Sequence, residues 1–131
     1  MVKILLVDDD LNIQRVYFKI LASEGFLVYQ AMNAEKATEI LISRHIDLVL
    51  LDINMPWIDG AFMKEVIDEY DSGLKVIVSS VYPLSEQKKR IPKADEYFDK
   101  SHGTEWLLTT IKKVLKSKEE KTNQTKEKVY E

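Results

Sequence analysis

Residues 48–60 read LVLLDINMPWIDG, and this stretch decides the fold of the 131-residue chain. Its four leading apolar residues predict a short strand that is buried on both faces of a sheet. The ionisable side chain of Asp52 stands where this strand ends, and Pro56 cannot continue a hydrogen-bonded element. Asp59 and Gly60 predict a turn into a helix. The sequence therefore places a carboxylate at the carboxyl end of a buried strand.

Four further segments have the composition of short strands, and a helical pattern follows each strand. These strands are expected at residues 4–7, 27–31, 76–78 and 96–98. The fourth helical pattern, at residues 84–90, is weak, and the last one begins at Thr104. Strands that alternate with helices in this way predict an α/β fold with a parallel sheet.

The apolar content of the strands predicts their order in the sheet. The most apolar strands begin near Ile4, Leu48 and Val76, and the least apolar begin near Leu27 and Glu96. This pattern fits the doubly wound order 2-1-3-4-5, in which the less apolar strands form the edges. In such a sheet a ligand binds beyond the carboxyl ends of the strands.

The first helix is expected to bury one apolar stripe and to expose the opposite face. The stripe comprises Ile13, Val16, Tyr17, Ile20 and Leu21. These positions follow the spacing of an amphipathic helix. Leu11, Gln14 and Phe18 are expected on the outer face, where Phe18 is a candidate for partner recognition. Packing of Phe18 against its own neighbours is an equal alternative.

Composition excludes several kinds of site. The chain has no cysteine, which excludes disulfides, thiolate metal sites and cysteine catalysis. Its net charge of -3 gives no electrostatic reason to expect nucleic-acid binding. No segment approaches the roughly 18 apolar residues of a membrane span. We expect a soluble, cytoplasmic domain at residues 1–118, followed by a charged, flexible extension at 119–131.

Polar residues collect at the predicted strand ends, namely Asp8, Asp9, Asp52, Ser80 and Lys100. Three neighbouring carboxylates repel one another, and a hard cation such as Mg²⁺ relieves that repulsion. Asp9 and Asp52 are expected as direct ligands, and Asp8 as a ligand through water. The Ser80 hydroxyl and the Lys100 ammonium suit phosphate oxygens. Each residue alone has an ordinary explanation, but together they suit phosphoryl transfer onto Asp52.

With these motifs the sequence resembles a response-regulator receiver domain of bacterial two-component signalling, of the chemotaxis-regulator type. The matching stretches are residues 3–10, 52–60, 76–80 and 94–100, and the resemblance covers about residues 1–118. It implies a flavodoxin-like fold of five strands and five helices. A chemotaxis member of this family is a known example of the strand order 2-1-3-4-5, so the order also follows from the resemblance.

The resemblance implies a role for each residue of the predicted site. Asp52 would be the phosphoacceptor that takes phosphate from a histidine kinase or a histidine phosphotransfer protein. The other implied roles are an acidic Mg²⁺ pocket at Asp8 and Asp9, a metal contact by the Asn54 backbone carbonyl, a switch hydroxyl on Ser80, a phosphate contact by Lys100 and an aromatic switch at Tyr97. Phosphorylation would then change the partner-binding surface.

Three features depart from the usual pattern of the family. Val81 stands where a small residue is usual, and we hypothesise that it narrows access to Asp52. Ser101 replaces the proline that usually follows the lysine. Because a non-proline cis peptide costs about 2.5–4 kcal/mol, we expect a trans Lys100-Ser101 bond or a strained cis one. Residues 83–92 predict a short or irregular fourth helix, and hence an atypical choice of output partner.

Other functions stay open at this point. The chain is either a stand-alone regulator or the receiver part of a longer protein with a DNA-binding or enzymatic output domain. A Mg²⁺-dependent aspartyl-phosphate hydrolase is disfavoured, because such enzymes typically carry a second Asp where this chain has Asn54. A pseudo-receiver that only binds partners is disfavoured by the complete set of site residues. We expect no enzymatic turnover of outside substrates, no direct nucleic-acid or membrane binding, an unidentified downstream partner, and a phosphorylation-dependent dimer as one oligomeric option.

Overall fold

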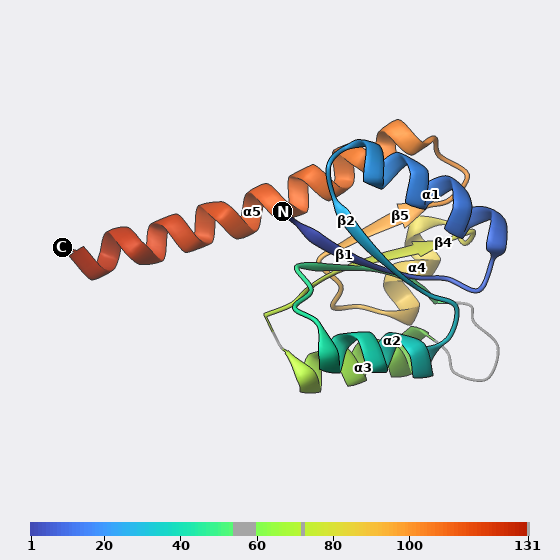
Figure 1. Cartoon of the computed structure of the whole chain (residues 1–131), viewed down its shortest axis with the longest axis horizontal. Coiled ribbons are helices and arrows are strands. Elements are labelled where there is room, and N and C mark those ends of the chain that lie inside the picture. Colours follow the sequence, from blue (N-terminus) through green and yellow to red (C-terminus); the bar gives the residue numbers. More distant parts are fainter. Residues whose placement is uncertain (54–59, 72, 131) are drawn as a thin grey trace.

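The computed structural model describes residues 1–53, 60–71 and 73–130, which form five strands and five helices in alternation (Figure 1). The strands are β1 (Lys3–Val7), β2 (Leu27–Ala31), β3 (Leu48–Asp52), β4 (Lys75–Ser80) and β5 (Glu96–Asp99). The helices are α1 (Leu11–Ser23), α2 (Ala34–Ser43), α3 (Gly60–Tyr70), α4 (Leu84–Arg90) and α5 (Thr104–Tyr130). All strand pairs are parallel, in the order β2-β1-β3-β4-β5. The predicted doubly wound sheet is confirmed.

Strand β3 forms the middle of the sheet, and all five of its residues are buried. It pairs with β1 on one side and β4 on the other. Helices cover both faces of the sheet, so both sets of alternating side chains on β3 contact apolar residues. This packing accounts for the unbroken apolar run that precedes Asp52.

Helices α1 and α5 lie on one face of the sheet and α2 and α3 on the other (Figure 1). A separate apolar core lies on each face. On one face, Leu50 of β3 packs with Tyr17 of α1 and Leu107 of α5. On the other, Leu51 of β3 packs with residues of α2 and α3, including Met63. A smaller cluster around Val78, Ile91 and Ile53 joins β4 to the end of α4.

The buried face of α1 differs from the predicted one. Gln14, Tyr17 and Leu21 are buried, whereas the side chain of Val16 is 47% exposed. The predictions that Val16 is buried and that Gln14 lies on the outer face are therefore wrong. The physical reason is that the Gln14 amide donates hydrogen bonds to backbone carbonyls at the ends of β1 and β2. These bonds allow a polar side chain to occupy the buried stripe. Phe18 is partly exposed, as predicted.

Helix α4 and the Lys100-Ser101 bond lie where the chain departs from the family pattern. Helix α4 has the expected bounds, and it ends before the buried Ile91. The Lys100-Ser101 bond is trans, because the described part of the chain contains no cis peptide. Helix α5 continues into the charged extension as far as Tyr130, and its C-terminal half projects away from the sheet (Figure 1). The extension is thus helical, and its flexibility stays a prediction.

Helices that could span a membrane are absent from the described residues. None of these helices combines the length with the apolar composition that crossing a bilayer requires.

Truncation of one buried residue of β3 and one partly exposed residue of α1 tests the fold. Leu50→Ala should lower the free energy of unfolding by about 2–5 kcal/mol, because Leu50 is fully buried and the truncation leaves a cavity. Val16→Ala should change it much less, by about 0.5 kcal/mol, because about half of Val16 is exposed. Urea denaturation followed by circular dichroism measures both. Equal losses for the two variants would contradict the observed orientation of α1.

Candidate functional site

Three carboxylates meet at the carboxyl ends of β1 and β3. Asp8 follows β1 directly and Asp52 ends β3, and these two strands are neighbours. One oxygen from each of Asp8, Asp9 and Asp52 lies within 4.8 Å of the others. Asp8 and Asp52 are buried and Asp9 is partly buried. The structure thus brings together the three acids that the sequence singled out.

Lys100 reaches this acidic cluster from the end of β5. Its Nζ lies 2.6 Å from Oδ2 of Asp8 and 3.7 Å from Oδ2 of Asp52. Only 9% of the Lys100 side chain is exposed, so water screens these ion pairs weakly. One ammonium faces three carboxylates, so the four groups carry two net negative charges when all are ionised. Oxygen ligands with excess negative charge suit a hard divalent cation.

Backbone hydrogen bonds hold Asp8 and its loop in place. Oδ1 of Asp8 accepts the backbone N–H of Asp10 at 2.9 Å. Asp10 caps α1, where its side chain accepts the N–H of Asn12 at 2.8 Å. The Gln14 amide also donates to the Asp8 carbonyl at 2.9 Å. The acidic end of β1 is therefore fixed before any ligand arrives.

Ser80 lies at the end of β4, the neighbour of β3 on the other side. Its side chain is fully buried, and its Oγ accepts the backbone N–H of Tyr82 at 3.1 Å. Its carbonyl accepts the backbone N–H of Lys100 at 2.8 Å. Ser80 thus lies between β3, which carries Asp52, and the loop that carries Lys100. The next residue, Val81, is 69% exposed.

The turn after Lys100 shows how the chain replaces the proline of the family pattern. Oδ1 of Asp99 accepts both the backbone N–H of Ser101 at 2.9 Å and its hydroxyl at 2.7 Å. These two hydrogen bonds lower the pKa of the Asp99 carboxyl below its usual value. The turn and the Ser80 carbonyl together fix the backbone on both sides of the Lys100 side chain.

Tyr97 lies on β5 and faces α4. Its ring is half-buried against Val78 and Ile91, and its hydroxyl donates to the Ile91 carbonyl. The same hydroxyl accepts the backbone N–H of Ala94 at 3.3 Å, and Nζ of Lys88 lies 5.8 Å from the ring centroid. The structure thus places Tyr97 in the cluster under α4, and its contacts there are separate from those of the carboxylates. Asn54, the remaining predicted site residue, lies outside the described residues.

Sequence reasoning missed three polar residues that support the site. Gln14 and Gln87 are buried in α1 and α4, and both donate hydrogen bonds to carbonyls at strand ends. Tyr17 is buried on the α1 side of the sheet, where burial and the charge of Asp8 raise its pKa to about 12. A signal existed for Gln87, since it stands four residues before the apolar Ile91, which is the spacing of one helical face.

A family model described as "Response regulator receiver domain" matches residues 4–112. The chain belongs to this family. It is therefore a receiver domain of the kind found in two-component response regulators, and the resemblance seen in its motifs is confirmed.

Proteins of known name or structure match the receiver domain over most of its length. The chemotaxis protein CheY of Halobacterium salinarum is 31% identical over 115 residues, which are 86% of this chain and 96% of that protein. The response regulator TrrA of Thermotoga maritima, crystallised with Mg²⁺ and BeF, is 34% identical with a TM-score of 0.80, over 87% of this chain and 99% of that one.

Two further matches are a complex with a histidine kinase and a much longer regulatory protein. TrrA has also been solved in complex with the histidine kinase ThkA, with a TM-score of 0.77 to this receiver domain over 88% of this chain and 99% of that one. The regulatory protein AtoC of Escherichia coli is 32% identical over 80 residues, which are 61% of this chain but only 17% of that protein. Receiver domains similar to this one thus occur both as nearly whole proteins and as small parts of longer regulators.

The buried phenol of Tyr17 predicts a pH dependence. The folded protein holds this proton up to about pH 12, whereas an unfolded tyrosine releases it near pH 10. The stabilisation is therefore complete below pH 10 and falls as pH rises towards 12, by about 2–3 kcal/mol in total. Urea denaturation at pH 9 and at about pH 11 should show a smaller loss for Tyr17→Phe than for the unmodified protein. Parallel losses in the two proteins would contradict the raised pKa.

Proposed function

We propose that this receiver domain accepts a phosphoryl group on Asp52 from a histidine kinase or a histidine phosphotransfer protein, and that phosphorylation changes the surface formed by α4 and β5. The observation that carries this proposal is the placement of Asp52. Its carboxylate shares a site with two other acids within 4.8 Å, and the Lys100 ammonium lies 3.7 Å away. This is the charge arrangement that phosphoryl transfer onto a carboxylate requires.

The transfer itself forms one bond and breaks one. An oxygen of Asp52 bonds to phosphorus, and the bond from phosphorus to the donor, a histidine nitrogen or an acyl oxygen, breaks with the electron pair leaving on the donor. Lys100 places its positive charge 3.7 Å from Asp52 and then faces the transferred phosphoryl oxygens. The Ser80 hydroxyl, whose oxygen accepts the Tyr82 N–H, is proposed to donate a hydrogen bond to the same oxygens.

The acid cluster fits Mg²⁺. Asp8, Asp9 and Asp52 offer carboxylate oxygens within 4.8 Å of one another, and Asn54 is proposed to add its backbone carbonyl. When bound, Mg²⁺ offsets the repulsion between the carboxylates and the charge on the phosphoryl group. The Mg²⁺ in the TrrA crystal structure supports this part of the proposal.

The output involves Ser80 and Tyr97. The Ser80 hydroxyl accepts a hydrogen bond from Tyr82, which lies in the loop between β4 and α4. The Tyr97 hydroxyl donates to the carbonyl of Ile91, at the end of α4. A new contact between the Ser80 hydroxyl and a phosphoryl group would bias the position of this loop, and the α4–β5 surface would follow. We therefore propose Ser80 and Tyr97 as the switch pair.

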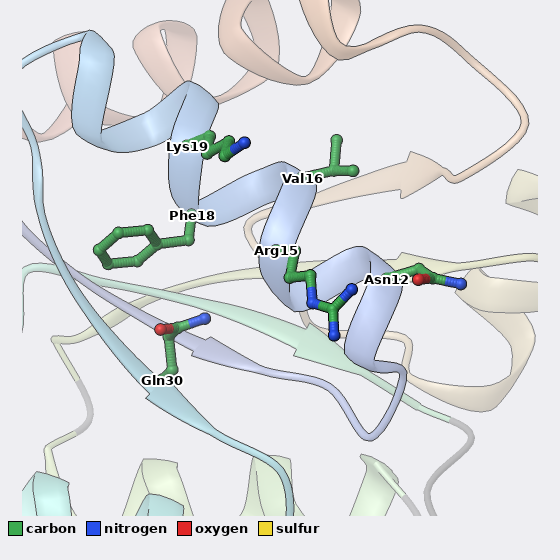
Figure 2. Close-up of a pocket in the computed structure, with 6 residues that line it drawn as sticks. All are labelled: Asn12, Arg15, Val16, Phe18, Lys19 and Gln30. Atoms are coloured by element: carbon green, nitrogen blue, oxygen red, sulfur yellow. The ribbon is translucent and has the colours of Figure 1, made fainter.

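The kinase or phosphotransfer partner is proposed to dock beside α1. A pocket of about 540 Å³ lies there, and Figure 2 shows its lining side chains, which come from α1 and β2. Val16 and Phe18 give it an apolar part, and Arg15 and Lys19 give it positive charge. The crystal structure of ThkA with TrrA supports a kinase as the partner.

Further parts of the proposal concern the whole protein. The match to AtoC favours a second candidate, in which this receiver controls an output domain in a longer protein. The regulatory family and the Asn at position 54 favour a switch that assists only its own phosphorylation and dephosphorylation. A cytoplasmic location, no direct contact with nucleic acid and a phosphorylation-dependent dimer complete the proposal.

Phosphorylation from a small donor tests the proposal directly. With Mg²⁺ and acetyl phosphate the protein should gain one acid-labile phosphoryl group, and chelation of Mg²⁺ should prevent this gain. Asp52→Asn should gain none, because the amide oxygen is a poor nucleophile. Intact-protein mass spectrometry measures the increase. No increase in the unmodified protein, or an equal increase in Asp52→Asn, would refute the proposal.

Val81 is proposed to limit the approach of water to the acyl phosphate on Asp52. Val81→Ala should therefore speed dephosphorylation, by about threefold to tenfold if it lowers the barrier by about 0.6–1.4 kcal/mol. Loss of labelled phosphate over time, after the donor is removed, measures the rate. An unchanged rate would show that Val81 does not control access.

A further inference from the structure

Gln87 is a polar side chain buried in the middle of α4. No part of it is exposed to solvent. Its amide nitrogen lies 2.8 Å from the Tyr82 carbonyl, 3.0 Å from the Phe98 carbonyl and 3.5 Å from the Ser80 carbonyl. Its amide oxygen has no hydrogen-bond partner among the described residues. The side chain therefore acts through its N–H donors, which join α4 to the ends of β4 and β5.

Tyr82 connects this amide to the proposed switch hydroxyl. The Tyr82 carbonyl accepts from Gln87, and the Tyr82 N–H donates to Oγ of Ser80 at 3.1 Å. Because that bond occupies a lone pair of Oγ, it orients the hydroxyl and directs its proton elsewhere. The orientation of the Ser80 proton thus depends on where Tyr82 is held.

Helix α4 contacts Tyr82 through two of its side chains, and its buried residue is polar. The helix has seven residues, and its buried member is Gln87. Arg90 of the same helix also lies over the Tyr82 ring, 4.3 Å from the centroid. Hydrogen bonds from Gln87 therefore take the part that an apolar anchor has in an ordinary short helix.

We propose that Gln87 is a positioning residue for phosphoryl recognition, which holds Tyr82 so that Ser80 presents its hydroxyl proton to the group on Asp52. The inference rests on the proposed function, since it concerns the same site. It predicts that the Gln87 amide contributes to phosphoryl binding only through Ser80. A residue that merely stabilised the fold would contribute independently of Ser80.

Gln14 provides a matched control on the other side of the sheet. Its amide nitrogen is also buried and donates to three carbonyls at strand ends, at 2.9 Å to Asp8, 3.0 Å to Ala31 and 3.3 Å to Leu6. These bonds fix the end of β1, and Tyr82 is not among the acceptors. Loss of the Gln14 amide should therefore affect the site without any dependence on Ser80.

Binding of beryllofluoride with Mg²⁺, followed by fluorine NMR or calorimetry, tests the inference by a double-mutant cycle. Gln87→Met keeps the length of the side chain and removes the donors. It should weaken beryllofluoride binding about tenfold, the cost of one well-placed hydrogen bond to a charged group, and leave binding of Mg²⁺ alone unchanged. In the Ser80→Ala background, Gln87→Met should have no further effect. Gln14→Met should have the same effect in both backgrounds.

Other results of this cycle would overturn either the role of Gln87 alone or the proposed function as well. An undiminished effect of Gln87→Met in the Ser80→Ala background, or no effect with Ser80 present, overturns the role of Gln87 and leaves the proposed function intact. Failure of the unmodified protein to bind beryllofluoride with Mg²⁺ overturns both. Circular dichroism shows whether each variant is folded. If Gln87→Met does not fold, Gln87→Asn, whose shorter amide cannot reach Tyr82, takes its place in the cycle.

Discussion

The ion pair of Lys100 with Asp8, extended to Asp52, is the interaction on which the site depends. Two of these carboxylates are buried, and a buried charge is costly unless it is paired. The Lys100 ammonium lowers the energetic cost of the buried carboxylates but leaves an excess of negative charge beside Asp9. In the proposed function that excess attracts a divalent cation, and Lys100 beside Asp52 faces the phosphoryl group.

The parallel sheet brings these residues together, and two buried glutamines hold the loops that carry them. Parallel pairing places the ends of β1, β3 and β4 along one edge, so that residues far apart in the chain meet there. Gln14 holds the loop that follows β1, and Gln87 holds the loop that follows β4. Each joins a helix to backbone carbonyls at or beside the ends of two strands. Asp8 and the Ser80 hydroxyl, the proposed switch group, are thus held from opposite faces of the sheet.

Features that depend on apolar pattern were predictable from sequence, and features that depend on individual hydrogen bonds were not. The run before Asp52 is apolar because β3 is covered on both faces, so both the strand order and the strand-end residues follow from pattern. Gln14 and Gln87 interrupt the apolar stripes of their helices, and nothing local shows that strand-end carbonyls compensate for their burial. Val16 was misassigned for the same reason, because the buried stripe of α1 includes Gln14 with Tyr17 and Leu21 and leaves Val16 partly exposed.

The central claim is that one particular carboxylate of the three becomes the acyl phosphate. Borohydride reduces an acyl phosphate to an alcohol and releases inorganic phosphate, so treatment of the phosphorylated protein converts the modified aspartate to homoserine. Peptide sequencing by mass spectrometry then identifies its position. The account predicts homoserine at position 52 alone, with Asp8 and Asp9 unchanged. Homoserine at position 8 or 9, or none in protein that carries phosphate, would contradict it.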